Sequence, residues 1–351
     1  MSKLTKKYLV SFIIGTRPEA IKLAPLIIIF KKCSIINTRV ILTGQHQEML
    51  KQVFDLYELK EDLNLNIMQA KQTLNDITIK SVEGITKELK KNRPNLVLIQ
   101  GDTSTTFAAA LSCFYEKIPF GHVEAGLRTD NIYNPYPEEV NRRLVSQMAS
   151  LNFAPTKHAF ENLKRSDLIG DIHLTGNTVI DALMYFKNEK KDLENIDFDF
   201  SKYKLILATV HRRENWGENL LNISNALKTI LDDNPDSCLL LPMHRNKVVR
   251  EPIMKILNNH DRAVLVEPLS YKEFLSAIKM SYLILTDSGG LQEEAPSFGK
   301  PVLVMRDTSE RQEAIDAGTA KLVGTKTENI ILFANKLLNN SEMYNSMSKK
   351  K

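Results

Sequence analysis

Several features that define particular classes of protein are missing from this sequence. Its 351 residues include three cysteines, widely separated and without a CxxC pair or a zinc-binding spacing. An odd, scattered set argues against a disulfide framework and favours buried, reduced thiols. No apolar run approaches the roughly 20 residues that span a bilayer. The N-terminal MSKLTKKYLVSFIIG lacks a small-residue cleavage site and predicts a first β-strand rather than a signal peptide. We therefore expect a cytoplasmic protein without membrane insertion.

Strong charge and the common cofactor motifs are missing as well. The 47 basic and 42 acidic residues leave a net charge of +5, which is too small to indicate nucleic-acid binding. The sequence contains no GxGxxG, no GxxxxGK[ST] and no HExxH motif. The Asp-x-Asp at 197–199 resembles the metal motif of some sugar-nucleotide enzymes, but it falls in a charged stretch that we interpret as a linker. We expect no metal and no nicotinamide cofactor.

What the chain does contain is a repeated alternation of short apolar runs and longer amphipathic segments. Continuous apolar runs indicate strands covered on both faces, as in the parallel sheets of α/β proteins. The runs lie at 8–14, 39–43, 95–100, 118–123, 151–154, 203–210, 238–242, 263–267, 282–286 and 301–305.

The alternation occurs twice, and the chain is long enough for two domains. We predict an N-terminal Rossmann-like domain over 1–176, a linker over 177–202 and a C-terminal Rossmann-like domain over 203–351. Two doubly wound parallel sheets in tandem predict a ligand cleft facing the carboxyl ends of both sheets.

Charged residues gather where strands of the first half end. Arg17 stands beside a helix start, where an anion is favoured, although a surface arginine on a turn is equally compatible. Asp102 follows the third run, and its alternative interpretation is a helix N-cap. Glu124 follows the fourth run, and Glu138 and Glu139 stand in the first turn of a predicted helix, where its dipole favours them. Three acidic sites at neighbouring strand ends resemble an acid/base site.

The second half offers histidines and a glycine-containing helix start. His211 and His244 each follow an apolar run, and either could instead be structural. The segment TDSGGLQEE opens a helix at which Ser288, Gly289 and Gly290 allow a phosphate to approach the backbone, with Glu294 one turn further along, where it could reach a ribose diol. Spacing alone therefore supports an enzyme that holds a phosphate-bearing ligand.

The ordered set of segments resembles the non-hydrolysing UDP-N-acetylglucosamine 2-epimerases from about residue 10 to 335. The segments are GTRPEAIKLAPLI, TGQHQEML, GDTSTTFAAAL, HVEAGLRT, PEEVNRR, TGNTVIDAL, HRRENWGENL, TDSGGLQEEAPSFGKPVLVMRDTSERQEA and AGTAKLVGT.

The resemblance implies a glycosyltransferase-B-like fold, a homodimer, and interconversion of UDP-N-acetylglucosamine and UDP-N-acetylmannosamine for surface polysaccharide synthesis, with no cofactor. UDP would leave to give a glycal intermediate and then add back. Transferred by motif, the acid/base residues are Asp102, Glu124 and Glu138, with His211 supporting the diphosphate. The substrate-binding set is Arg17, Lys22, Ser288, Gly289, Gly290, Glu294 and Arg311.

Some bacterial members of this family also bind a second UDP-N-acetylglucosamine as an activator. Gln45, Lys71, Arg212 and His244 occupy the corresponding motifs, but Lys71 and Glu48 stand where the family leads us to expect Arg and Gln. The chain also ends where the resemblance predicts a further helix. Three alternatives stay open: a hydrolysing epimerase, a glycosyltransferase of the same fold, and a catalytically silent sugar-nucleotide sensor.

Overall fold

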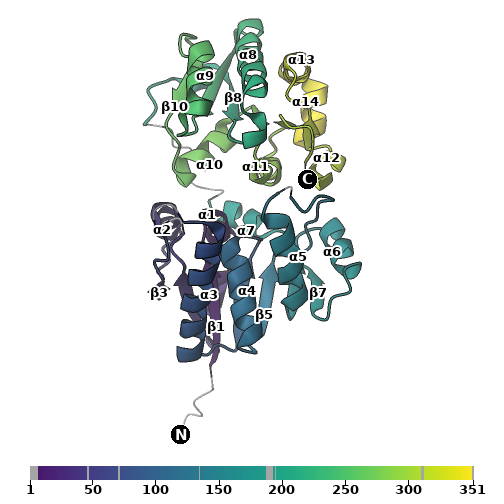
Figure 1. Ribbon diagram of the computed structural model, residues 1–351. Helices are drawn as coiled ribbons and strands as arrows, with labels where there is room; N and C mark the ends of the chain where they lie inside the picture. Colours follow the sequence, from purple (N-terminus) through teal and green to yellow (C-terminus); the bar gives the residue numbers. More distant parts are fainter. Residues whose placement is uncertain are drawn as a thin grey trace. The chain divides into compact units, whose positions relative to one another are not determined.

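The computed structural model describes residues 7–45, 47–69, 72–133, 135–186, 193, 195–309 and 312–349, and it divides into two compact units. Unit 1 comprises residues 1–185 and unit 2 residues 186–351 (Figure 1). The predicted interval 177–202 begins with a helix, α7 (Thr178–Tyr185), that packs against α1 in unit 1. The predicted domain limits themselves stay a prediction.

Unit 1 is a seven-stranded parallel sheet in the order β3-β2-β1-β4-β5-β6-β7. Figure 1 shows α3, α4 and α5 side by side along one of its faces. Its elements before α7 are β1 (Tyr8–Ile14), α1 (Arg17–Lys32), β2 (Ile36–Leu42), α2 (Gln47–Leu56), β3 (Leu63–Asn64), α3 (Leu74–Lys91), β4 (Leu96–Gln100), α4 (Ser104–Tyr115), β5 (Phe120–Val123), α5 (Glu138–Met148), β6 (Leu151–Ala154), α6 (Lys157–Lys164) and β7 (Asp171–Leu174).

Unit 2 is a six-stranded parallel sheet in the order β10-β9-β8-β11-β12-β13, the doubly wound order of dinucleotide-binding folds. Its elements are η1 (Phe200–Lys202), β8 (Lys204–Thr209), η2 (Arg213–Asn215), α8 (Glu218–Asp233), β9 (Ser237–Pro242), α9 (Lys247–Leu257), β10 (Ala263–Val266), α10 (Tyr271–Met280), β11 (Leu283–Thr286), α11 (Gly289–Glu294), η3 (Ala295–Phe298), β12 (Val302–Val304), α12 (Gln312–Asp316), β13 (Ala320–Leu322), α13 (Thr327–Asn339) and α14 (Ser341–Ser348).

The predicted α/β class with two parallel sheets is confirmed, and each of the ten apolar runs forms a strand. The runs are apolar without interruption for the predicted reason, because both faces of the sheets are covered. In unit 1, Ile13 belongs to the core cluster that includes residues of α3, α4 and α5. Its neighbour Phe12, paired in register with Val40 and Leu98, is also fully buried. Three further strands, β3, β7 and β13, were not predicted.

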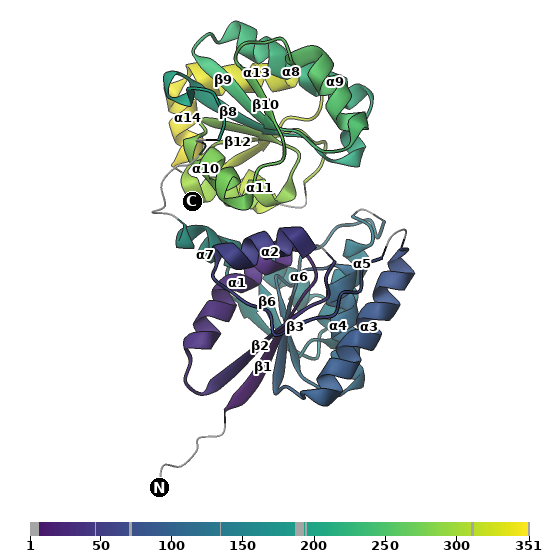
Figure 2. The ribbon, with the colours of Figure 1, turned by 90° about the vertical axis from the view of Figure 1, so that its left-hand side faces the viewer.

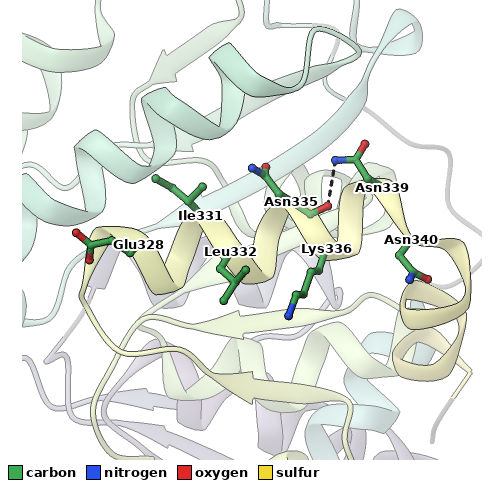
Figure 3. Close-up of a pocket in the computed structure, with 7 residues that line it drawn as sticks. All are labelled: Glu328, Ile331, Leu332, Asn335, Lys336, Asn339 and Asn340. Carbon is green, nitrogen blue, oxygen red and sulfur yellow. Dashed lines mark hydrogen bonds between the residues drawn. The ribbon is translucent and has the colours of Figure 1, made fainter.

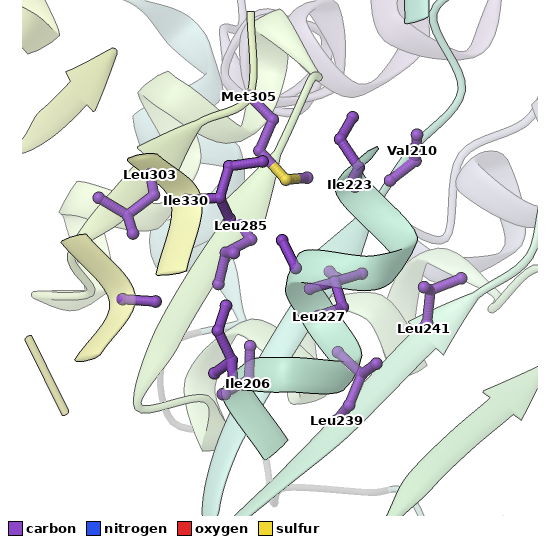
Figure 4. Packing of buried hydrophobic residues seen from close by; sticks show 14 of the residues in the cluster. Ile206, Val210, Ile223, Leu227, Leu239, Leu241, Leu285, Leu303, Met305 and Ile330 are labelled. Carbon is purple, nitrogen blue, oxygen red and sulfur yellow. The ribbon is translucent and has the colours of Figure 1, made fainter. Parts of the chain in front are cut away.

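The core of unit 2 lies between its central strands and the helices α8, α9 and α13. Figure 4 shows Leu227 of α8 among strand residues that include Ile206, Leu239 and Leu285. Figure 2 shows α8, α9 and α13 lying over this sheet. Burying a leucine or isoleucine side chain stabilises a fold by about 1.5–3 kcal/mol, so this cluster holds the strand ends in fixed positions.

Hydroxyl side chains fix where several helices begin. Thr103 accepts a hydrogen bond from the backbone N–H of Thr106 (3.1 Å) and so caps α4. Ser270 caps α10 in the same way through Glu273. Such caps contribute about 1 kcal/mol each. Because Thr103 fills this role, Asp102 is not the cap of α4, and its carboxylate has a different partner.

Candidate active site

In both parallel sheets the strand order changes direction beside the first strand, between β1 and β4 in unit 1 and between β8 and β11 in unit 2. Ligands of doubly wound folds bind outside the carboxyl ends of the strands at this point. In unit 1 these ends lead into Arg17 and Asp102, and the adjacent β5 leads into Glu124. In unit 2 they lead into His211 and Ser288. These predicted candidates therefore lie at or beside the place in each sheet where the strand order changes direction.

Glu124 is held by groups from two other elements. Its Oε2 accepts hydrogen bonds from the Lys22 ammonium on α1 and from the Gln100 side-chain amide at the end of β4. The residue is 8% exposed and has a φ of +65°, in the left-handed region. That conformation costs a non-glycine residue about 1–3 kcal/mol, which the surrounding contacts offset. A carboxylate fixed in this way beside an ammonium is suited to transferring a proton at a defined position.

Asp102 is oriented from α5. Its Oδ2 lies 2.5 Å from Nη2 of Arg142, which is 5% exposed, and its backbone carbonyl accepts a hydrogen bond from the Asn141 side chain at 2.9 Å. The ion pair with Arg142 holds the Asp102 carboxylate, and the hydrogen bond from Asn141 holds the Asp102 backbone carbonyl. The Asp102 side chain remains 23% exposed, so a ligand can reach it.

His122, two residues before Glu124, supports the turn that precedes Asp102. Its Nε2 lies 2.7 Å from the carbonyl oxygen of Gly101, and its Nδ1 lies 3.2 Å from the Ser146 hydroxyl on α5. A carbonyl only accepts, so Nε2 carries the proton and Nδ1 accepts from the hydroxyl. Burial lowers the pKa of His122 to about 4, which keeps the ring neutral. His122 is therefore a structural residue.

The adjacent glutamates of α5 have different environments. Glu139 is fully buried and accepts hydrogen bonds from the Arg143 guanidinium (2.6 Å) and the Thr129 backbone N–H (3.0 Å). It therefore ties the loop after Glu124 to α5. Glu138 is the first residue of α5 and is only partly buried, which makes it the more accessible of the two. The accessible member of the pair is thus the predicted acid/base candidate.

A further buried carboxylate shapes the turn that presents Arg17. Glu19 is 2% exposed; its Oε2 accepts from the Gly15 N–H (2.6 Å) and its Oε1 from the Thr16 hydroxyl (2.9 Å). Burial raises the pKa of Glu19 to about 7, against the lowering effect of these hydrogen bonds. A Cβ at Gly15 would lie 2.3 Å from the Thr105 hydroxyl, so this turn requires glycine.

In unit 2, one carboxylate joins the loops after β8 and β11. Asp287 is fully buried, and its Oδ2 accepts from the backbone N–H groups of His211 and Arg212, both at 2.9 Å, and from the Asn215 side chain at 3.0 Å. Asp287 immediately precedes Ser288, so these bonds fix the His211 segment against the start of α11.

The start of α11 presents small and polar groups. A Cβ at Gly290 would meet nothing closer than Glu294 Oε1 at 3.6 Å and the Ser288 hydroxyl at 3.9 Å. The Ser288 N–H donates to the Thr286 hydroxyl at 2.9 Å, which fixes the turn into the helix. Ser288, Gly290 and Glu294 therefore share one neighbourhood, as a ligand-binding set requires.

The predicted activator residues are distributed over both units. Gln45 accepts a hydrogen bond from the Thr105 hydroxyl at 3.2 Å in unit 1. His244 is exposed after β9, and its Nδ1 accepts from the Asn246 N–H at 3.1 Å. Lys71 of this set, and Arg311 of the substrate-binding set, lie outside the described residues.

A hollow in unit 2 is separate from these residues. It is lined by Glu328, Ile331, Leu332, Asn335, Lys336, Asn339 and Asn340, which lie along α13 and at its end (Figure 3). It contains none of the candidate residues and presents no convergent charged cluster. Within the described ranges, no group of three or more His, Cys, Asp or Glu side chains is arranged to hold a metal ion, and no helix has the length and apolar character of a membrane span.

Comparison with known proteins identifies the family. The model for UDP-N-acetylglucosamine 2-epimerase matches residues 30–351. The chain is 48% identical to the UDP-N-acetylglucosamine 2-epimerase of Campylobacter jejuni over 99% of its own length and 93% of that protein. This chain belongs to the UDP-N-acetylglucosamine 2-epimerase family. The resemblance seen in the sequence motifs is thereby confirmed.

Solved structures agree with this epimerase assignment. The UDP-GlcNAc 2-epimerase of Neisseria meningitidis bound to UDP-GlcNAc has a TM-score of 0.92 at 46% identity, covering 98% of this chain and 95% of that one. The Methanocaldococcus jannaschii epimerase in complex with UDP-GlcNAc and UDP has a TM-score of 0.81 at 34% identity, covering 97% of this chain and 98% of that one. The two-sheet architecture is thus that of the epimerases.

Sequence reasoning missed three supporting residues of this epimerase fold: Glu19, His122 and Asp287. Each stands within two residues of a candidate, but each also fits a commoner structural role. Glu19 has the position of a first-turn helix acid, and Asp287 that of a residue opening a helix. Only the three-dimensional contacts separate them from residues with those ordinary roles.

Proposed function

We propose that this protein reversibly epimerises UDP-N-acetylglucosamine at carbon 2 to give UDP-N-acetylmannosamine, as a non-hydrolysing epimerase. The observation that carries the proposal is the set of groups at the carboxyl ends of the central strands. In unit 1 fixed carboxylates follow these strands, and in unit 2 an anchored Ser-Gly-Gly turn follows one of them. Family membership supplies the substrate class.

The proposed chemistry is an elimination followed by an addition. The hydrogen on carbon 2 is not acidic, because no carbonyl of the ring adjoins it. When the bond from carbon 1 to the UDP oxygen breaks, the positive character at carbon 1 makes that proton removable. A base takes the proton and the electrons form the ring double bond, giving the glycal and UDP. Proton delivery to the opposite face of carbon 2 and re-addition of UDP complete the inversion, so nothing is consumed.

Unit 1 would supply the proton-transferring groups, Glu124, Asp102 and Glu138. Glu124 is the strongest candidate, because two donors fix its Oε2 and its exposure is small. Lys22 would hold the carboxylate in place and add positive charge near the departing diphosphate. A positioned acid or base contributes about 10²–10⁴-fold to a rate.

Unit 2 would hold the nucleotide. Ser288, Gly289 and Gly290 would receive the diphosphate, with His211 beside it, and Glu294 would bind the ribose diol. Arg17 and Arg311 would add positive charge. Fixed donors and cations directed at the leaving diphosphate lower the barrier for its departure, because they need no reorganisation as the charge develops.

Incubation with UDP-N-acetylglucosamine alone, followed by separation of the products, tests the function. An equilibrium mixture with UDP-N-acetylmannosamine supports the proposal. UDP with free N-acetylmannosamine would identify a hydrolysing epimerase instead. A requirement for an acceptor would identify a glycosyltransferase, and binding without turnover would identify a sensor.

We also propose that UDP-N-acetylglucosamine activates the enzyme through Gln45, Lys71, Arg212 and His244. Gln45 is already held by Thr105, next to the turn that requires Gly15. With UDP-N-acetylmannosamine as the only substrate, the reaction should begin with a lag that added UDP-N-acetylglucosamine removes. An immediate linear rate that the additive does not raise would exclude activation.

We further propose a cytoplasmic homodimer. Phe114, Tyr115 and Ile169 of unit 1 are 58%, 66% and 98% exposed, and Phe114 and Ile169 line one shared hollow. Exposed apolar groups of this kind mark association surfaces. Sedimentation should give twice the chain mass, and cell fractionation should place the protein in the cytoplasm; a monomer or a membrane fraction would contradict these assignments.

A further inference from the structure

Asp287 has a second carboxylate oxygen that takes no part in anchoring the His211 segment. While Oδ2 accepts three hydrogen bonds, Oδ1 lies 3.0 Å from Nδ1 of the His211 ring. This Oδ1 is buried and makes no hydrogen bond of regular geometry among the described residues, so the His211 ring nitrogen is the polar group that it faces at close range. The His211 side chain remains 42% exposed.

The contacts of Asp287 favour its ionised carboxylate. Burial by itself would raise the pKa of Asp287, but the contact with His211 and the backbone N–H groups of His211 and Arg212 lower it more, so the pKa lies below its usual range. An ionised carboxylate has only acceptors, so a ring nitrogen facing it must carry a hydrogen. Which nitrogen of a histidine is protonated is set by the partner of the other one.

We propose that Asp287 is a positioning residue that holds His211 in the tautomer with its proton on Nδ1, which leaves Nε2 to act on the ligand. A proton added at Nε2 gives an imidazolium whose charge is balanced by Asp287. This charge lies in the segment anchored to Asp287, the residue that precedes Ser288. The assignment of the proton to Nδ1 does not depend on which reaction the protein catalyses. The role of Nε2 toward the diphosphate rests on the proposed function.

Substitution Asp287→Asn should switch the tautomer while keeping the fold. Three donors face the Oδ2 position, so the amide oxygen takes that place and the amide NH₂ faces Nδ1 of His211. A donor at that position requires Nδ1 to accept, which moves the proton of the neutral ring to Nε2. Asn215→Ser is the matched control, because it removes one donor to Oδ2 and leaves the contact with Nδ1 in place.

Nitrogen-15 NMR of the full chain labelled at histidine reads the tautomer directly, and the spectrum of His211→Gln assigns the signal. We expect Nδ1–H in the wild type and in Asn215→Ser, and Nε2–H in Asp287→Asn. A wild-type ring with Nε2–H overturns the proposal even if the Asn variant does not fold. An unchanged tautomer in a folded Asp287→Asn variant overturns it as well.

Kinetics test the use of the tautomer separately. Asp287→Asn should lower kcat roughly 100-fold or more, on the usual size of an acid–base contribution, with a smaller change in KM. A switched tautomer with wild-type kcat would refute the catalytic use. A wild type that does not epimerise would refute the proposed function and leave the tautomer result standing.

Discussion

The buried carboxyl of Glu19 predicts an unusual dependence of stability on pH. Its partners, the Gly15 N–H and the Thr16 hydroxyl, carry no charge, and burial raises its pKa from 4.5 to about 7. The fold therefore favours the neutral carboxyl. The resulting stabilisation is complete below pH 4.5 and is lost as the pH rises through about 7.

The size of the effect follows from the pKa difference. A difference of about 2.5, at about 1.4 kcal/mol for each pKa unit, corresponds to about 3 kcal/mol. Glu19→Gln reproduces the neutral form, since its oxygen can accept from Gly15 and its NH₂ can donate to the Thr16 hydroxyl. At pH 8 the variant should therefore be the more stable by up to about 3 kcal/mol, and at pH 4.5 the two proteins should unfold alike.

Thermal unfolding from pH 4.5 to 8 measures this difference. For a unit of this size, each kcal/mol shifts Tm by about 2–4 °C, so the gap should approach about 6–12 °C at pH 8. Glu88→Gln is the matched control: Glu88 is also buried, but it pairs with Arg39 at 2.6 Å, so its replacement should destabilise. Parallel curves for wild type and Glu19→Gln across this range would refute the reasoning.

Three other substitutions test the site and the turns around it. Glu124→Gln should lower turnover roughly 100-fold or more, because it removes the carboxylate beside Lys22 that we propose transfers the proton; activity near wild type would remove Glu124 from the acid/base candidates. Gly15→Ala should destabilise by about 1–3 kcal/mol in denaturant unfolding, because its Cβ would meet Thr105 at 2.3 Å. Gly290→Ala, whose Cβ has no neighbour closer than 3.6 Å, should fold normally but bind UDP more weakly in calorimetry; unchanged affinity would argue against a diphosphate at this turn.

The sequence predicts most of the architecture, because strands covered on both faces are apolar throughout. The exceptions have a physical cause. β7 lies at the edge of its sheet and is mostly exposed, and β3 has only two residues, so neither leaves an apolar run. β13 includes Lys321 within three residues at the other sheet's edge.

The sequence predicts candidate site residues where charged or polar side chains follow strand ends, and it misses residues that act by holding another residue. Glu124 stands out in the sequence because a charge follows a buried strand. Asp287 does not, since its partners His211 and Asn215 are over 70 residues away and only the pairing of β8 with β11 brings them together. Distant contacts of this kind leave no local pattern.

We propose that carboxylates of this enzyme remove and return the proton on carbon 2 of the sugar. Turnover of UDP-N-acetylglucosamine in D₂O tests it most directly, with the products followed by proton NMR. We predict UDP-N-acetylmannosamine carrying deuterium at carbon 2, and loss of this exchange in Glu124→Gln. Epimerisation in which the wild-type product keeps its original hydrogen at carbon 2 would contradict the account.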